Sequence, residues 1–263
     1  MTKHSFAVMA YKDSPYLSDC LDSLKDQTVK SEIYITTSTP SLYIDEMAKK
    51  YGIKVFTTEP GKGIAHDWNF SLSLAKTKYV TLAHQDDLYN NNYAELCIKA
   101  AEKFNDTLIC FTGYNEIVGA KERSSTVMLT AKKIMNFIFM PFKKNIRTIG
   151  WKKFSQSFGT AIPCPSVMYN KETLHDFTFS EKYKVSLDWD AWLRMSEMKG
   201  RFVFVPKTLS KHRIHKASAT TEGIQENVRQ QEDFEIYCRI WPQFIARFLS
   251  KLYAGSYKSN MNI

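Results

Sequence analysis

The sequence is poor in the features that mark several classes of protein. Its five cysteines are odd in number and form no CxxC pair, which argues against a zinc site or a disulfide framework and predicts a reducing compartment. No apolar run reaches the roughly 18 residues that a membrane span needs, and the first residues do not resemble a signal peptide. A Walker loop, a GxGxxG motif and Ser-His-Asp spacing are also missing. These absences predict a cytoplasmic protein.

The composition fits one large α/β domain. The chain has 263 residues, and 44% of them are hydrophobic, which is enough for a full core. Its formal charge is +9, so nucleic acid, an anionic membrane surface and phosphorylated ligands are all compatible partners. Because no nucleic-acid motif accompanies the charge, we expect no nucleic-acid partner.

Short β-branched apolar segments alternate with segments of helical periodicity through the first half of the chain. Strands are expected at 5–10, 32–37, 53–57, 79–83 and 108–112, with helices between them. This alternation predicts right-handed crossovers and a mostly parallel sheet flanked by helices. Beyond it we expect an irregular stretch at 119–160, a helix opening at 186–194, a strand at 201–205, a basic loop at 211–216 and a helical tail at 224–263.

The acidic turn at His84, Asp86 and Asp87 follows the strand at 79–83 directly. Adjacent carboxylates at the end of a buried strand repel each other and lose water, so a cation there would stabilise them. Open α/β sheets bind ligands at that end of their strands, and Mg²⁺ is often held by one or two carboxylates together with ligand phosphates. The turn therefore predicts a site for a metal and a diphosphate. The alternative is that the two aspartates cap a helix beginning near Asn91.

A second acidic pair, Asp188 and Asp190, lies in the first turn of the helix at 186–194. A carboxylate that removes a proton, a metal-binding diacid and the histidines of the basic loop at 211–216 are the parts that a metal-dependent transfer reaction needs. The structural alternatives are that Asp188 is an N-cap and that Asp190 pairs with Arg194 at i,i+4.

Several short motifs, taken in order, resemble a family 2 glycosyltransferase of the GT-A fold. The resemblance covers roughly residues 5–220 and is nearest to bacterial enzymes that build surface polysaccharides. The motifs are 10–12 after the first strand, 20–27, 63–69, 84–87, 188–194 and 213–215.

This resemblance implies roles for particular residues. Asp86 would bind the metal, Mg²⁺ or Mn²⁺, with His84 and His215 beside it, and Asp87 would support it or contact the sugar. Asp188 would deprotonate the acceptor hydroxyl, with Asp190 next in line.

The donor side of the site follows from the same resemblance. Tyr11 would pack on the nucleotide base, and Asn69 would brace the helix beside the donor. Thr37 and Ser38 stand where many members have paired aspartates, His84 stands for the first acid of Asp-X-Asp, and Leu187 precedes Asp188 where a glutamate is usual. A UDP-sugar is the first candidate donor, although the Thr37–Ser38 departure weakens the case for uridine.

The implied protein is an inverting transferase that moves a sugar from a nucleotide-diphosphate sugar to a glycan or a lipid-linked acceptor. Residues 1–220 would form the GT-A domain, with a nucleotide-binding half at 1–115 and an acceptor-side half at 116–220, and 221–263 would form a helical extension. The alternatives are a sugar-phosphate nucleotidyltransferase and a non-enzymatic basic module that binds membrane or nucleic acid.

Two amphipathic basic segments leave a further choice open. Lysines flank the aromatic stretch at 134–142, and a stripe of large apolar residues runs through 240–253 beside Arg247 and Lys251. The first segment is compatible with a core helix or with contact on a lipid-linked acceptor or a membrane surface, and the second with packing, with a homodimer interface, or with peripheral contact on the inner face of a membrane.

Overall fold

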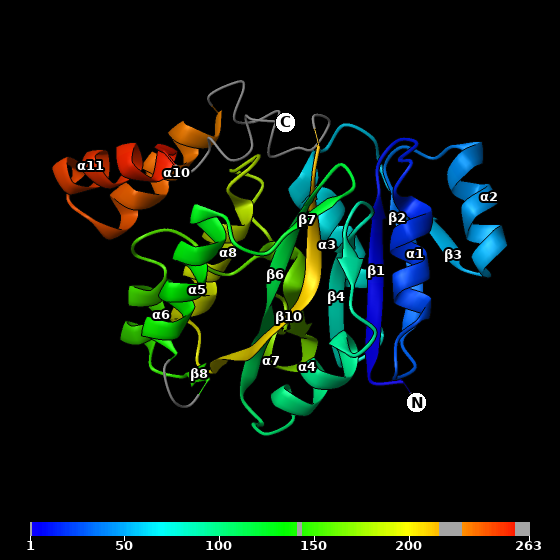
Figure 1. The fold of residues 1–263 in the computed structure, drawn as a ribbon, viewed down its shortest axis with the longest axis horizontal. Helices are drawn as coiled ribbons and strands as arrows, with labels where there is room; N and C mark the ends of the chain where they lie inside the picture. The colour runs from blue at the N-terminus through cyan, green and yellow to red at the C-terminus, as the bar shows by residue number, and fades with distance from the viewer. Residues whose placement is uncertain (1, 141–143, 216–227, 256–263) are drawn as a thin grey trace.

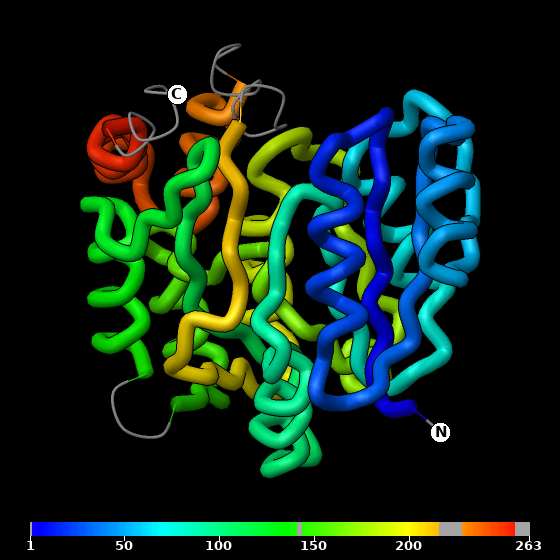
Figure 2. Tube along the Cα trace, turned by 45° about the vertical axis from the view of Figure 1, so that its right-hand side comes forward, coloured from blue at the N-terminus to red at the C-terminus, as the bar shows by residue number. Residues whose placement is uncertain are grey.

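The fold is a central sheet with helices on both faces (Figures 1 and 2). The computed structural model describes residues 2–140, 144–215 and 228–255. The strands are β1 (His4–Ala10), β2 (Glu32–Thr37), β3 (Lys54–Thr57), β4 (Tyr79–His84), β5 (Leu88–Tyr89), β6 (Thr107–Val118), β7 (Lys121–Arg123), β8 (Asn145–Ile146), β9 (Val167–Asn170) and β10 (Arg201–Ile214). The helices are α1 (Leu17–Lys25), α2 (Leu42–Tyr51), α3 (Ile64–Leu74), α4 (Tyr93–Ala101), α5 (Val127–Phe139), α6 (Ile149–Ser155), α7 (Lys171–Leu174), α8 (Leu187–Glu197), α10 (Val228–Ile240) and α11 (Gln243–Ala254), with a short 3₁₀ turn at Cys164–Ser166.

The sheet order is β3-β2-β1-β4-β9-β6-β10-β5, with β7 paired to β6 and β8 to β10. β3, β2, β1 and β4 are parallel neighbours, as are β6 and β10. β9 lies antiparallel between β4 and β6 and joins the two parallel blocks. The expected mostly parallel GT-A sheet is therefore confirmed, with antiparallel pairs at its centre and edges.

Two hydrophobic layers cover the faces of the sheet. On one face, Leu21 of α1, Ile44 of α2 and Cys97 of α4 belong to one buried cluster. On the other face, Trp68 of α3 and Trp192 of α8 belong to a second cluster, which also takes in α10. Because both faces are covered, ligands can reach the sheet only at its ends.

Local capping explains where the helices begin and end. The Ser41 side chain accepts a hydrogen bond from the Ile44 N–H at the start of α2, and α2 ends at Gly52 with φ 63°. Thr126 caps α5 in the same way through the Leu129 N–H. These signals lie within a few residues of the helix ends and can be read from the sequence.

Three expectations from the sequence are wrong in detail. Residues 119–160 are not irregular, because they contain α5 and α6. The basic segment expected as a loop at 211–216 is strand up to Ile214, where β10 continues beside β6. The interpretation of Asp86 and Asp87 as helix caps also fails, because α4 begins at Tyr93 and its N-cap is Asn92.

The C-terminal helices pack on the α8 side of the sheet. Tyr237 of α10 and Tyr253 of α11 both contact Trp189, with ring centroids 4.8 and 5.6 Å apart. A Cβ atom at Gly159 would come within 2.6 Å of the Tyr253 ring, so only glycine fits there. The expected boundary at residue 220 lies outside the described residues. In the described part of the chain, no helix has both the length and the apolar character needed to cross a bilayer.

Candidate active site

The carboxyl ends of three neighbouring parallel strands bring the predicted site residues together. Ala10 is in register with Thr37, and Met9 is in register with His84. Residues that follow β1, β2 and β4 therefore meet at the C-terminal ends of these strands. The amide of Gln85 joins two of these segments, because it accepts from the Tyr11 N–H at 3.0 Å and donates to the Tyr11 carbonyl at 2.8 Å.

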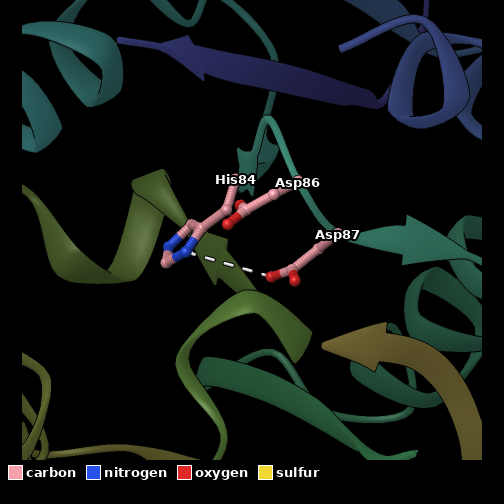
Figure 3. A group of neighbouring side chains, drawn as sticks. All are labelled: His84, Asp86 and Asp87. Carbon is pink, nitrogen blue, oxygen red and sulfur yellow. Dashed lines mark ion pairs between the residues drawn. The ribbon is translucent and has the colours of Figure 1, made fainter. Parts of the chain in front are cut away.

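The turn after β4 forms a cluster suited to a metal ion. His84, Asp86 and Asp87 each offer a ligand atom, and these atoms lie within 4.8 Å of one another. Their side chains converge on one space in Figure 3, where His84 Nδ1 lies 3.9 Å from Asp87 Oδ2. Asp87, expected only to support the metal or touch the sugar, is thus an equal member of this group.

The Asp87 carboxylate is fully buried, and one of its two oxygens has hydrogen-bond partners while the other has none. Its Oδ1 accepts from the Arg213 backbone N–H at 2.9 Å and pairs with His212 Nδ1 at 3.0 Å. Its Oδ2 and the Nε2 atom of His84 are buried without a hydrogen-bond partner. Since buried polar atoms are nearly always satisfied, these two atoms fit a site that a cation completes.

The end of β10 supplies positive charge to the diacid. His215 Nε2 lies 2.8 Å from Asp86 Oδ2. Burial alone would raise the pKa of Asp86, but this hydrogen bond and the charges of His84 and His212 outweigh burial and lower it. For His212, burial opposes protonation, yet the charge and hydrogen bond of Asp87, together with Asp86, raise its pKa to about 9.

Arg213 fastens three segments together at the site. Its Nε donates to the Asp86 carbonyl at 3.0 Å, and its guanidinium pairs with Asp19 of α1 at 3.2 Å. The same group lies over the Tyr16 ring, 4.3 Å from its centroid. Arg213 therefore holds the turn that carries Asp86 and Asp87.

On the β2 side, Ser38 contacts a carboxylate that the sequence did not single out. Ser38 donates to Asp67 Oδ2 of α3 at 2.9 Å, while Asp67 Oδ1 is buried without a hydrogen-bond partner. Burial raises the pKa of Asp67, and Ser38 and His66 oppose that rise. Thr37 accepts a hydrogen bond from the Thr39 N–H at 3.0 Å, which shapes the turn.

Tyr11 and Asn69 differ in how freely they could meet a ligand. Tyr11 directly follows β1 and is 53% exposed. Both ends of the Asn69 amide are engaged with the Phe179 backbone, at 2.9 and 2.7 Å. Asn69 therefore fastens α3 to the segment before α8.

Asp188 and Asp190 have different surroundings. Asp188 accepts a hydrogen bond from the Trp189 N–H at 2.7 Å. Burial raises its pKa, and the charges of Arg229, Lys132 and His84 act against that rise. Asp188 is therefore near enough to His84 to interact with it electrostatically.

Asp190 is buried and paired through both oxygens. Its Oδ2 meets Arg194 Nε at 3.1 Å, and its Oδ1 meets Arg239 of α10. The i,i+4 pair read from the sequence is thus present. These contacts tie α8 to α10.

Glu232 of α10 binds the backbone just before the start of α8, a role that the sequence did not reveal. Its carboxylate accepts from the backbone N–H groups of Lys184, Val185 and Ser186 at 2.7, 2.9 and 2.9 Å. The next residue, Asp233, accepts from the Ser186 hydroxyl at 2.7 Å. Because Asp188 comes two residues after Ser186, this clamp fixes the backbone that carries Asp188.

Replacing Glu232 with Gln is expected to lower kcat about tenfold to a hundredfold while the donor KM stays nearly constant. One end of the Gln amide cannot accept, so at least one N–H before α8 loses its partner, and the cost approaches about 1–3 kcal/mol where that group is buried. Steady-state kinetics would measure the split between kcat and KM. Glu235→Gln on the same helix is the matched control, because Glu235 pairs with the largely exposed Lys182. Equal effects of the two substitutions would contradict the positioning role.

Comparison with known proteins agrees with this geometry. The model of the glycosyl transferase family 2 matches residues 5–164. The hyaluronan synthase of Pasteurella multocida is 26% identical over 234 residues, which is 84% of this chain. The chain spans only 22% of the length of that synthase.

Solved structures show the same fold at low identity. The S. aureus TarS 1–349 complex with UDP-GlcNAc superimposes with a TM-score of 0.64 at 15% identity, covering 98% of this chain and 73% of TarS 1–349. The mannosyltransferase PcManGT of Pyrobaculum calidifontis, in complex with GDP-Man and Mn²⁺, gives 0.64 at 13% identity and covers 97% and 69%.

The sheet and the helices on its two faces are those of the GT-A glycosyltransferase fold. Within that class, the chain belongs to the glycosyl transferase family 2. The resemblance inferred from the short motifs is therefore confirmed.

Proposed function

We propose that the chain transfers a sugar from a nucleoside diphosphate sugar to a hydroxyl group of a glycan or lipid-linked acceptor, with inversion at the anomeric carbon. The observation that carries this proposal is the geometry of His84, Asp86 and Asp87 at the C-terminal ends of the parallel strands, with the half-buried Asp188 carboxyl at the start of α8 near enough to His84 to interact electrostatically. The acceptor oxygen forms a bond to the anomeric carbon as the bond from that carbon to the diphosphate breaks. Asp188 takes the hydroxyl proton, and the nucleoside diphosphate leaves.

Asp86, Asp87 and His84 are the residues that would hold a divalent cation, Mg²⁺ or Mn²⁺. The unsatisfied Asp87 Oδ2 and the anionic Asp86 support this assignment. When bound, the ion would neutralise charge on the departing diphosphate. His215 orients Asp86 and adds a polar group on the same side. PcManGT and GalNAc-T7 were both solved with Mn²⁺, which supports a divalent ion here.

We assign recognition of the nucleotide base to Tyr11, Ser38 and Asp67. The exposed Tyr11 ring offers a stacking surface. The free Asp67 Oδ1 offers an acceptor for a base N–H such as uracil N3–H or the N–H groups of guanine. TarS was solved with UDP and PcManGT with GDP-Man, so both bases belong in the test.

Replacing Asp67 with Asn is expected to weaken UDP binding about tenfold, because a hydrogen bond to a charged acceptor contributes about 1.5–3 kcal/mol. Pyrophosphate binding should not change, since pyrophosphate has no base. Calorimetric titration of both ligands in the presence of Mn²⁺ would measure this. An equal loss for the two ligands would contradict the assignment.

The function is tested by a thermal-shift panel of nucleoside diphosphates and their sugars, with and without Mn²⁺. A ligand that binds the native state raises Tm by mass action, so one nucleoside diphosphate and its sugar should raise Tm only with the metal. Binding of a nucleoside triphosphate together with a sugar phosphate, and release of pyrophosphate, would instead support a nucleotidyltransferase. The likeness to a hyaluronan synthase supports polysaccharide synthesis as the wider process.

A further inference from the structure

The large apolar side chains that the structure leaves exposed are concentrated at one end of the molecule. In the described residues, the exposed large hydrophobics other than Tyr11 and Leu42 lie on α5, α6, α11 and the turn after α6. They are Val127, Ile134, Phe137, Ile138, Ile149, Trp151, Phe154, Phe158, Phe244, Phe248 and Leu252. We name this set the aromatic face. Both views place α5, α6 and α11 at the end opposite α2 (Figures 1 and 2).

Ring contacts connect the part of the aromatic face on α6 with the residue that precedes α11. Trp151 and Phe154 have ring centroids 5.4 Å apart, and Phe154 and Phe158 are 5.5 Å apart. Phe158 then meets Trp241, just before α11, at 5.7 Å. The exposed rings of α6 thus run into the helix pair that ends the described chain. An apolar surface of this kind usually marks an interaction site.

On α11, the inner and outer sides of the helix differ sharply. Ala246 and Ser250 are buried. Phe244, Phe248 and Leu252, spaced four residues apart, are 76%, 63% and 61% exposed. The stripe expected at 240–253 is therefore two stripes, of which one packs inward and the other faces solvent.

The helices that carry the aromatic face have charged side chains of one sign only, although Glu197 of α8 pairs with Lys153 of α6 at 2.9 Å. No Asp or Glu occurs in the sequence between Glu122 and Glu172, nor after Glu235. The helices α5, α6 and α11 therefore carry no acidic residue, and Arg247 and Lys251 are exposed beside the outer stripe of α11. A partner whose surface is both apolar and anionic fits this combination.

We propose that the aromatic face docks on a membrane surface that contains anionic phospholipid. Phe, Leu and Trp side chains on one side of a helix, with Arg and Lys beside them, are the composition of helices that lie in the headgroup region. Basic residues near such a surface are attracted to its negative potential. The proposal depends on the exposed residues and their charge and does not rest on the catalytic assignment.

The test is flotation of the full chain with vesicles of phosphatidylcholine alone or with about 30 mol% phosphatidylglycerol, a typical anionic load. The wild-type chain should float with the anionic vesicles and remain largely unbound with the neutral ones. Phe248→Glu should reduce the bound fraction at least about tenfold, since it places a charge on the apolar stripe. Leu42→Glu on α2 is the matched control, because Leu42 is 82% exposed at the opposite end.

A second pair of variants tests the charge. Arg247→Glu with Lys251→Glu should reduce binding to anionic vesicles about tenfold or more. Lys49→Glu with Lys50→Glu on α2 changes the net charge equally and should have little effect, because both lysines are exposed at the far end. Circular dichroism would show whether each variant keeps its fold.

Three results would overturn the proposal. The first is wild-type chain that stays unbound with anionic vesicles. The second is unchanged flotation of Phe248→Glu. The third is a dimer in light scattering that Phe248→Glu converts to a monomer, without vesicle binding, because the aromatic face would then join two copies of the chain.

Discussion

Replacing Asp188 with Asn is expected to lower kcat for sugar transfer by about a thousandfold, which is within the range of a lost general base. The Kd of the donor should stay nearly constant, because the turn at His84–Asp87 is held by hydrogen bonds from His212, Arg213 and His215, which the substitution leaves in place. Single-turnover kinetics and calorimetric titration of the donor would measure the two quantities separately. Residual turnover close to the wild-type rate would contradict the assignment of the base.

The pH profile gives an independent measure of Asp188. A general base works only when it is deprotonated, so kcat/KM falls as pH falls through its pKa. Because burial raises that pKa, the acid limb should lie above the ordinary carboxyl range near 4. The residual activity of the Asn variant should lack this limb. An acid limb that the substitution leaves in place would belong to another group.

Asp190 provides a contrast within the same helix. Asp190→Asn removes the anion that Arg194 and Arg239 share, and because the two arginine side chains are 34% and 37% exposed, the cost should lie below the roughly 3–5 kcal/mol of a fully buried pair. We expect a large fall in Tm for Asp190→Asn and a small one for Asp188→Asn. The opposite order would exchange the two roles.

Replacing Asp86 with Asn is expected to weaken Mn²⁺ binding about a hundredfold or more, given that loss of even outer-shell partners costs 10–100-fold. The pKa of Asp86 is lowered, so the wild-type site presents an anion at neutral pH, and the amide removes that charge. Titration with Mn²⁺, followed by electron paramagnetic resonance, measures affinity without reference to turnover.

A surface aspartate offers the control for this experiment. Asp45 is exposed on α2, so Asp45→Asn changes the net charge equally while leaving the acidic turn intact. Unchanged Mn²⁺ affinity in the Asp86 variant would remove the metal from this turn. Loss of affinity in both variants would point to a general effect of charge.

The parts of the site that could be predicted from the sequence are those fixed by local order. A diacid directly follows β4, so a metal site that includes Asp86 could be predicted at the C-terminal end of that strand, and the family resemblance added Tyr11 and Ser38, which follow the neighbouring strands β1 and β2. Asp188 at the start of α8 also followed from local pattern and from the family motif. These signals need only a few consecutive residues and the rules of βα packing.

The missed parts depend on partners distant in sequence. Glu232 meets backbone N–H groups 46–48 residues earlier, and nothing in its own surroundings distinguishes it from a solvated glutamate. The charged side chains of Lys211–Arg213 made this part of β10 look like a loop in the sequence. They are tolerated in a strand because Glu122, Asp87 and Asp19 pair with them. α5 was not predicted over its full length, and its large apolar residues do not share one environment: Leu129 and Phe139 are buried, while Val127, Ile134, Phe137 and Ile138 are exposed.

The clamp at Glu232 has a consequence for how the chain can be shortened. A protein cut at residue 220 would retain every strand that the structure describes, together with the acidic turn, and it would lose the Glu232 carboxylate, which accepts from the backbone N–H groups before Asp188. Such a fragment should capture a donor yet turn it over poorly. Truncation would then separate donor binding from proton removal. The proton transfer would depend on α10, whose role is to position the backbone that carries Asp188.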